Sequence, residues 1–226
     1  MAKSNDWYKK MAKALVDKAW AASMPPDPLL SPAQSRSVSA FASIQRRHGA
    51  VMPYLLADAL ADLDEVDVFL EPKIGITREA LRLAETGDIE VCRRAHCTPQ
   101  EGIVRDVQVD VAALDHRTGY AMALEVKRGV ANVDASKRRS TIRDGLGVMA
   151  MMRDFAARHG LPDAEPDFRV VSMYGRSGFP AALTVTGDAL DLYLEAKVSG
   201  EIWRLERALR HEIARRTQGF GDTPAP

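Results

Sequence analysis

The sequence predicts an α/β fold in which a mixed central sheet is flanked by helices, with helical additions at both ends of the chain. Two runs of alternating apolar and polar residues, 107–112 and 120–127, are separated by a short loop with a glycine, which is typical of a β-hairpin. A segment with helical periodicity, 134–159, follows this hairpin, and the β-branched segment 168–174 predicts a further strand.

Composition places the chain among ordinary globular proteins and limits its partners. Of its 226 residues, 46% are hydrophobic and 27% are charged, and 31 basic residues balance 31 acidic ones. A net charge of zero excludes a protein that holds nucleic acid by bulk charge, although a local basic patch is compatible with it. No apolar run reaches the roughly 18 residues of a membrane span, the N-terminus lacks the apolar core of a signal peptide, and two cysteines cannot frame a disulfide-stapled fold. We therefore expect a cytoplasmic protein without a membrane segment.

The N-terminal part of the chain is expected to be helical. Apolar residues at three-to-five spacing predict a helix over the first twenty residues, and three prolines in Met24–Pro28 then break the chain. Ser31-Pro32-Ala33-Gln34 forms a capping box that opens a second helix, which should run to about residue 47. Gly49 and Pro53 predict a break or kink before a further helical face at 51–63.

The remaining predicted elements follow in chain order. Extended pieces at 66–70 and 73–77 flank Pro72, a short helix covers 77–84 and a short strand 89–93; helices are expected at 188–196 and 201–217, and a frayed tail at 219–226. Gly145 and Gly147, inside the helix at 134–159, are expected to permit close packing of that helix on the sheet.

One face of the predicted hairpin carries an unusual set of polar side chains. The valines of the first strand and alternate residues from Tyr120 to Val126 form an apolar face, of the kind that a sheet packs against a helix. On the other face, small alanines leave room above the sheet. Among them lie two carboxylates, a lysine and a glutamine: Asp110, Glu125, Lys127 and Gln108.

The two carboxylates are expected to meet across the hairpin. Asp110 and Glu125 pair directly if the turn centres between Arg117 and Thr118. Cross-strand partners have Cβ atoms about 4.5–5.5 Å apart, so both carboxylates can reach one ion. Lys127 is two residues beyond Glu125 on the same strand, and its side chain therefore points the same way.

These residue types predict a metal site. Two bare carboxylates so close repel one another unless a cation lies between them. Oxygen ligands without histidine or cysteine favour a hard ion, Mg²⁺ or Mn²⁺. A lysine beside such an ion can orient an attacking water or offset the charge that develops on a phosphate. Together these groups are the parts needed to hydrolyse a phosphodiester, so Asp110, Glu125 and Lys127 are candidate catalytic residues.

The arrangement resembles the D…ExK active site of the PD-(D/E)XK nuclease superfamily, which includes many type II restriction endonucleases and Holliday-junction resolvases. Asp110 is followed, after an interval of 14 residues that contains a turn, by Glu125-Val126-Lys127. The surrounding segments, 108–115 and 123–129, are similar in sequence to the resolvase-like branch of the superfamily. The order of elements is similar to the restriction-endonuclease-like α-β-β-β-α-β core, with the identity of the first core strand, within 66–77, left open.

The resemblance implies a ligand set and a domain organisation. Asp110, Glu125 and the backbone carbonyl of Val126 would hold magnesium, and Lys127 would lie near the attacking water. No small-molecule cofactor is implied. The chain would divide into an N-terminal helix and Pro-rich linker (1–30), a nuclease-like core (31–180) and a C-terminal helical extension (181–226).

The chain departs from the family pattern at several positions. Val109 stands where a proline often precedes the motif aspartate, and Gln108 stands where resolvase-like members often carry an acid. Many members add an acid from the first core helix. Asp62 is the candidate for that acid in this chain, and Asp58 is a weaker one.

A solvated ladder of charges is the alternative interpretation of this pattern. D-x(10–20)-E-x-K spacing occurs by chance in many soluble chains, and hairpins carry Glu–Lys pairs on their wetted faces. The metal site is favoured by the conjunction of two acids on one face, alanines around them and basic sequence beyond the triplet.

Basic residues gather directly after the triplet, in and before the first turns of the helix at 134–159. A helix N-terminus offers free N–H groups to phosphate, and basic side chains there would add contacts that position a nucleic acid without reading its sequence. A solvated cationic face is the alternative. The candidate residues are Arg128, Lys137, Arg138, Arg139 and Arg143.

Two further features are weaker candidates. Cys92, His96 and Cys97 lack a second ligand pair at zinc spacing, so structural or incidental roles are expected. The last helix, 201–217, is amphipathic and basic, and packing on the core is its default role, with a nucleic-acid contact or a homodimer contact as alternatives.

The sequence therefore predicts a magnesium-dependent endonuclease that acts on DNA. A nucleic-acid-binding or scaffolding module without catalysis on the same fold is the alternative from a different class, and an RNA-cleaving variant differs only in its substrate.

Overall fold

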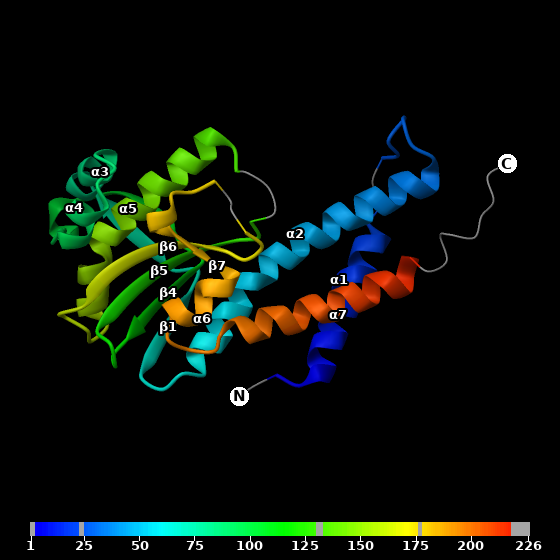
Figure 1. Ribbon diagram of the computed structural model, residues 1–226. Helices are drawn as coiled ribbons and strands as arrows, with labels where there is room; N and C mark the ends of the chain where they lie inside the picture. Colours follow the sequence, from blue (N-terminus) through cyan, green and yellow to red (C-terminus); the bar gives the residue numbers. More distant parts are fainter. Residues whose placement is uncertain (1–2, 23–24, 130–132, 176–177, 218–226) are drawn as a thin grey trace. The chain divides into compact units, whose positions relative to one another are not determined.

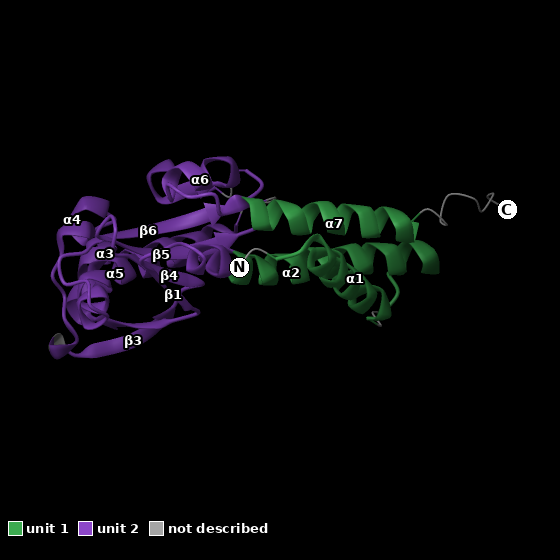
Figure 2. Ribbon diagram, turned by 90° about the horizontal axis from the view of Figure 1, so that it is seen from below, with its two compact units in different colours: residues 1–55, 200–226 green, residues 56–199 purple. Residues whose placement is uncertain are grey.

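A computed structural model describes residues 3–22, 25–129, 133–175 and 178–217 (Figure 1). The chain forms two compact units, residues 1–55 with 200–226 and residues 56–199 (Figure 2). These boundaries fall at other positions than the predicted segments 1–30, 31–180 and 181–226. The predicted tail at 219–226 lies outside the described residues. In the described part of the chain, every helix is too short or too polar to cross a membrane.

The first unit is built from helices. It contains α1 (Asn5–Ala21), most of α2 (Pro32–Ala61) and nearly all of α7 (Ser199–Thr217). Each helix buries an apolar stripe, which agrees with the periodicity that predicted them. The predicted capping box opens α2, because the Ser31 N–H donates to Gln34 Oε1 at 3.0 Å and the Gln34 N–H donates to Ser31 Oγ at 3.3 Å.

Of the break or kink predicted at Gly49 and Pro53, the break is absent. Both residues lie inside α2, which is continuous from Pro32 to Ala61. A proline removes one backbone donor from a helix. The flanking residues Met52 and Leu55 are almost fully buried, so packing stabilises this stretch in spite of the proline.

The second unit is an α/β structure with a mixed central sheet flanked by helices, as predicted. The strand order is β1-β4-β5-β6-β7; the pairs β1–β4 and β4–β5 are antiparallel, and the pairs β5–β6 and β6–β7 are parallel (Figure 1). The strands are β1 (Val66–Leu70), β4 (Val111–Asp115), β5 (Tyr120–Lys127), β6 (Glu165–Ser172) and β7 (Thr184–Thr186).

A long bent ribbon joins this sheet to a second, two-stranded one. The second sheet pairs β2 (Lys73–Thr77) with β3 (Ile103–Gln108). Its register continues that of β1 and β4, because Leu70 faces Val111 and Lys73 faces Gln108. Two backbone bonds cross the bend, from the Glu71 N–H to the Asp110 carbonyl at 2.9 Å and from the Val109 N–H to the Pro72 carbonyl at 3.2 Å. The predicted strand 107–112 is therefore split, and Asp110 lies at the bend.

Helix α5 (Ala135–Arg158) packs between the main sheet and β2. On the main sheet it covers the face that carries Ala112, Ala121 and Ala123, and on the ribbon it meets Ile74 and Ile76. The prediction that the alanine face leaves room above the sheet is therefore wrong. Both faces are buried, since Met122, Leu124 and Val126 on the other face are also buried, and the small alanines let α5 approach closely.

Three shorter elements refine the predicted order. α3 (Arg78–Glu85) matches the predicted short helix, but the segment predicted as strand 89–93 is a helix, α4 (Ile89–Arg94). The Asp88 side chain caps it by accepting from the Glu90 and Val91 N–H groups. The predicted helix 188–196 is reduced to the 3₁₀ turn Gly187–Ala189 and α6 (Leu190–Tyr193); further 3₁₀ turns cover Pro99–Glu101 and Ala181–Leu183.

The predicted role of Gly145 in close packing is confirmed. A Cβ atom at this position would lie 2.1 Å from the ring of Phe168, a buried residue of β6. We expect Gly145→Ala to lower the free energy of unfolding by about 2 kcal/mol, because α5 or the ring must move. Urea unfolding of the two proteins measures the difference.

Gly147→Ala is the matched control for this substitution. Its Cβ would meet Ile76 Cγ2 at 3.3 Å, a contact that small adjustments relieve, and alanine favours the helix. Its stability should equal or slightly exceed that of the wild type. Equal stabilities of the two alanine variants would contradict this account of the packing.

Candidate active site

The structure confirms the predicted register of the hairpin. Val111 faces Leu124 and Asp115 faces Tyr120, so the turn lies between them, as predicted. Continuing this register by one residue beyond the Val111–Leu124 pair places Asp110 opposite Glu125. Asp110 lies just outside β4, and Glu125 is inside β5.

The Asp110 side chain is hydrogen-bonded to β5, the strand that carries the triplet Glu125-Val126-Lys127. Its Oδ2 atom accepts a hydrogen bond from the Val126 N–H at 2.6 Å. A strand N–H ordinarily donates to a backbone carbonyl of the neighbouring strand, but β4 has ended in a bend at this level. The Asp110 carboxylate therefore takes the place of the backbone and is held beside Glu125 and Lys127.

Glu125 and Lys127 form an ion pair on one side of β5. The Lys127 ammonium donates to Glu125 Oε1. Their side chains are only 20% and 24% exposed, respectively, so the pair lies in a partly desolvated position rather than on an open surface. This partial burial argues against the fully solvated ladder of charges that was the alternative interpretation.

The environment of Asp110 disfavours its charged form. The pKa of Asp110 is raised from its ordinary value of 3.8 to about 6, first by burial and then by the negative charges of Glu125 and Glu71, against the opposing effects of the Val126 N–H and the Lys127 ammonium. A half-buried carboxylate beside a second carboxylate is a position that a cation would stabilise.

Glu71 is a neighbour that the sequence analysis missed. It lies opposite Asp110 at the bend, with its N–H donating to the Asp110 carbonyl, and its backbone has a positive φ of 50°. Non-glycine residues adopt this conformation rarely, and such positions gather at functional sites. The only signal in the sequence is the Glu71-Pro72 step between two extended pieces, which indicates a turn but not its partner.

The positions of three predicted accessory residues give no support for a place beside the carboxylate pair. Asp62 is exposed and follows α2, a few residues before Val66, which pairs with Asp115 at the end of β4 remote from Asp110. Asp58 is also exposed, one turn earlier in α2. Gln108 is exposed on β3, where it faces Lys73. The main-sheet register brings neither Asp62 nor Gln108 to the carboxylate pair.

The donor set fits a hard divalent ion with few protein ligands. Within the described residues, no cluster of three or more His, Cys, Asp or Glu side chains is close enough to hold a metal ion. Asp110 and Glu125 supply two carboxylates, and the Val126 carbonyl lies between Glu125 and Lys127 in the chain. Mg²⁺ commonly uses one or two carboxylates, with water and substrate phosphate as its other ligands.

The basic residues of α5 are only partly arranged as predicted. Lys137, Arg139 and Arg143 are exposed, and Arg138 is half-buried. The first turn offers fewer free N–H groups than expected, because the Asp134 side chain accepts from the Ser136 and Lys137 N–H groups. Arg139 and Arg143 line a shallow hollow with Ser136 and Ser140, so the side chains rather than the helix terminus present positive charge here.

Arg128 has a different environment from the α5 residues. Its guanidinium lies over the ring of Tyr174, 5.3 Å from the centroid. Its Nε atom is buried and has no hydrogen-bond partner among the described residues. Arg128 is thus fixed directly beside Lys127 by stacking, whereas Lys137 and Arg139 extend into solvent.

The cysteines have structural positions, as expected. Cys92 and Cys97 form no disulfide in the described part of the chain and are buried in the core around α5, whereas His96 is exposed. Burial raises the pKa of Cys92 to about 11. A protonated thiol is a poor metal ligand.

No protein-family profile, curated protein or solved structure was found to match this chain.

The raised pKa of Asp110 predicts a pH-dependent stability. Because the folded state holds the proton more tightly, stability falls as pH rises from about 4 through about 6, and it stays lower above that window. Asp110→Asn can still accept the Val126 hydrogen bond and removes the charge. After allowance for solvent screening, we expect the variant to be more stable than the wild type by about 1–2 kcal/mol at pH 7.

Urea unfolding at pH 7 and at pH 3.5 measures this difference. The gain should nearly disappear at the lower pH, where most of the wild-type Asp110 is protonated in both states. A variant less stable than the wild type at pH 7 would show that the carboxylate is not destabilised by its surroundings.

Proposed function

We propose that this protein is a magnesium-dependent phosphodiesterase, an endonuclease of the PD-(D/E)XK type that acts on DNA. The observation that carries the proposal is the hydrogen bond from the Val126 N–H to the Asp110 carboxylate. It joins the motif aspartate to the middle residue of the motif triplet. Two acids that are remote in sequence from one another thereby share one partly buried position with a lysine.

The order of elements supports the same proposal. The end of α2, then β1, β4, β5, α5 and β6 follow one another as in the α-β-β-β-α-β core that the motif implies. β1 pairs with β4 in the main sheet, and in the proposed core it would be the first strand. The segment from β2 to β3, which includes α3 and α4, would then be an insertion between the first and second core strands, β1 and β4.

Each motif residue has a role in the proposed reaction. Asp110, Glu125 and the Val126 carbonyl would hold Mg²⁺ or Mn²⁺, which when bound supplies a Lewis acid and lowers the pKa of water. The Lys127 ammonium is within reach of the Glu125 carboxylate and would orient the attacking water or offset the negative charge that develops on the phosphate. The partial burial of the pair strengthens this electrostatic effect, because less water screens it.

The proposed substrate is a phosphate backbone that lies along the N-terminal part of α5. Lys137, Arg139 and Arg143 are exposed there, one short connection beyond Lys127. Contacts of this kind fix the position of a duplex without selecting its sequence. The neutral net charge of the chain makes such a local patch the means of attraction.

Lys127→Met tests the catalytic part of the proposal. We expect cleavage of DNA in Mg²⁺ to fall at least about 100-fold, because the charge beside the reacting phosphate is lost. Cleavage should be measured with purified protein on plasmid, single-stranded, branched and RNA substrates, with EDTA as the metal-free reference.

Lys197→Met is the matched control, since Lys197 is an exposed lysine of the same unit that lies outside the motif. It should cleave at the wild-type rate. Undiminished cleavage by the Lys127 variant would refute the assigned role, and nucleic-acid binding that is indifferent to metal, without cleavage, would support the non-catalytic alternative instead.

The α5 patch predicts a salt dependence. Replacing Lys137, Arg139 and Arg143 by glutamine should weaken DNA binding in EDTA and reduce the slope of log K against log salt by about 0.9 for each phosphate that the protein no longer neutralises. Fluorescence anisotropy over a range of salt concentrations measures it. The corresponding triple substitution of Arg94, Lys197 and Arg207, all exposed, should leave the slope unchanged. Equal slopes in the two triple variants would place the DNA elsewhere.

A further inference from the structure

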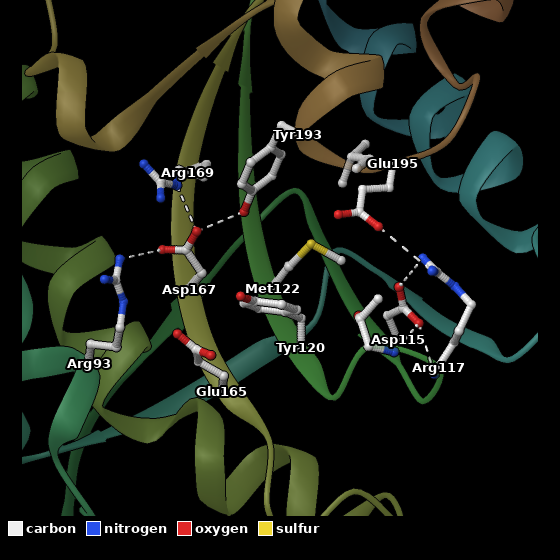
Figure 3. A pocket seen from close by; sticks show the side chains of 12 residues that line it. Arg93, Asp115, Arg117, Tyr120, Met122, Glu165, Asp167, Arg169, Tyr193 and Glu195 are labelled. Carbon is white, nitrogen blue, oxygen red and sulfur yellow. Dashed lines mark hydrogen bonds and ion pairs between the residues drawn. The ribbon is translucent and has the colours of Figure 1, made fainter.

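A cavity of about 260 Å³ lies at the end of β5 and β6 remote from the carboxylate pair (Figure 3). Tyr120 and Glu165, which are the first paired residues of these two strands, both line it, whereas Lys127 is at the other end of β5. Met122 and Asp167 line its floor and alternate with residues whose side chains pack on α5. The cavity is therefore on the other face of the sheet, and α6 and the two residues after it complete the wall.

One wall of the cavity is held rigid around Asp167. This side chain is 5% exposed and accepts from three donors: Arg93 Nη2 at 3.2 Å, Arg169 Nε at 2.7 Å and the Tyr193 hydroxyl at 2.8 Å. Burial raises the pKa of Tyr193, so its hydroxyl stays protonated and donates. Asp167 thus neutralises two arginines and fixes the tyrosine ring at the cavity wall (Figure 3).

The third arginine of the cavity is also engaged. Arg117 donates to Asp115 Oδ2 at 3.2 Å, and Asp115 is buried and accepts further bonds from the Arg117 and Thr118 N–H groups. All three guanidinium groups therefore face carboxylates already, and an anionic ligand would have to compete with those carboxylates.

Two carboxylates at the rim are less fully paired than Asp115 and Asp167. Glu165 is exposed, and its side chain has no hydrogen-bond or ion-pair partner among the described residues. Glu195 is exposed and is 3.7 Å from Arg117 Nη1, and its backbone has a positive φ of 49°. Figure 3 shows the two carboxylates on opposite sides of Met122 and Tyr120.

We propose that this cavity binds a small organic cation, a guanidinium or ammonium group on a short apolar stem. Because the two carboxylates lie on opposite sides of Met122 and Tyr120, a single charge would pair with one of them, Glu165 or Glu195, and a molecule with two charges would pair with both. The apolar surface of Met122 and the rings of Tyr120 and Tyr193 would contact the stem. The volume is slightly below the roughly 300–1,000 Å³ of pockets for drug-sized ligands, so a single amine or one basic side chain fits it. This site is independent of the proposed nuclease activity.

Titration with agmatine and spermidine tests the proposal, with chemical-shift changes in ¹H–¹⁵N spectra as the readout. We expect saturable shifts at the backbone amides of Tyr120, Glu165 and Glu195. The double variant Glu165→Gln with Glu195→Gln should weaken binding at least about tenfold, because each charge-assisted bond is lost. Asp188→Asn removes an exposed charge just before α6 that does not line the cavity, and it should bind as the wild type does.

Parallel titration with a capped Gly-Arg-Gly peptide separates the two sources of such a cation. Binding of agmatine without the peptide assigns the cavity to a free amine, and binding of the peptide assigns it to an arginine side chain; either result supports the cation site. The proposal is overturned if none of the three probes shifts these amides at about 10 mM, or if the double variant binds as tightly as the wild type.

Discussion

The bend in the long ribbon is the constraint on which the candidate active site depends. The paired strands run without a change of register from the main sheet into the two-stranded one, and they turn where Glu71 faces Asp110. Because β4 ends at this bend, the Val126 N–H donates to the Asp110 side chain. The backbone geometry thereby brings the aspartate to the strand that carries Glu125 and Lys127.

This arrangement has an energetic cost that other parts of the unit offset. A half-buried carboxylate beside a second one destabilises the metal-free fold, as the raised pKa of Asp110 indicates. The sheet beneath it is stabilised by α5, which packs closely because Gly145 lies against Phe168 and because alanines cover that face. A rigid scaffold under an unfavourable cluster of charges is what a functional site requires.

Much of this site could be predicted from the sequence, because alternation and turn position together determine which residues face one another. The register that places Asp110 beside Glu125 followed from the hairpin pattern and agrees with the structure. The bend did not follow, since Val107, Val109 and Val111 alternate as in one straight strand. The alternation also gives no sign that α5 covers the alanine face of the hairpin. Glu71 cannot be predicted as a neighbour of Asp110, because the two residues are about forty positions apart in the sequence. The α4 segment was predicted as a strand because a short apolar run fits a strand as well as a helix. The signal in the sequence that favours the helix is Asp88, whose side chain caps it.

The central claim is that Asp110, Glu125 and the Val126 carbonyl hold one divalent ion. Anomalous X-ray diffraction from crystals grown with Mn²⁺ tests it most directly. The account predicts a peak about 2.0–2.3 Å from one carboxylate oxygen of each acid, with water completing the coordination. A well-diffracting crystal without a peak at this position, or with Mn²⁺ bound only elsewhere, would contradict it.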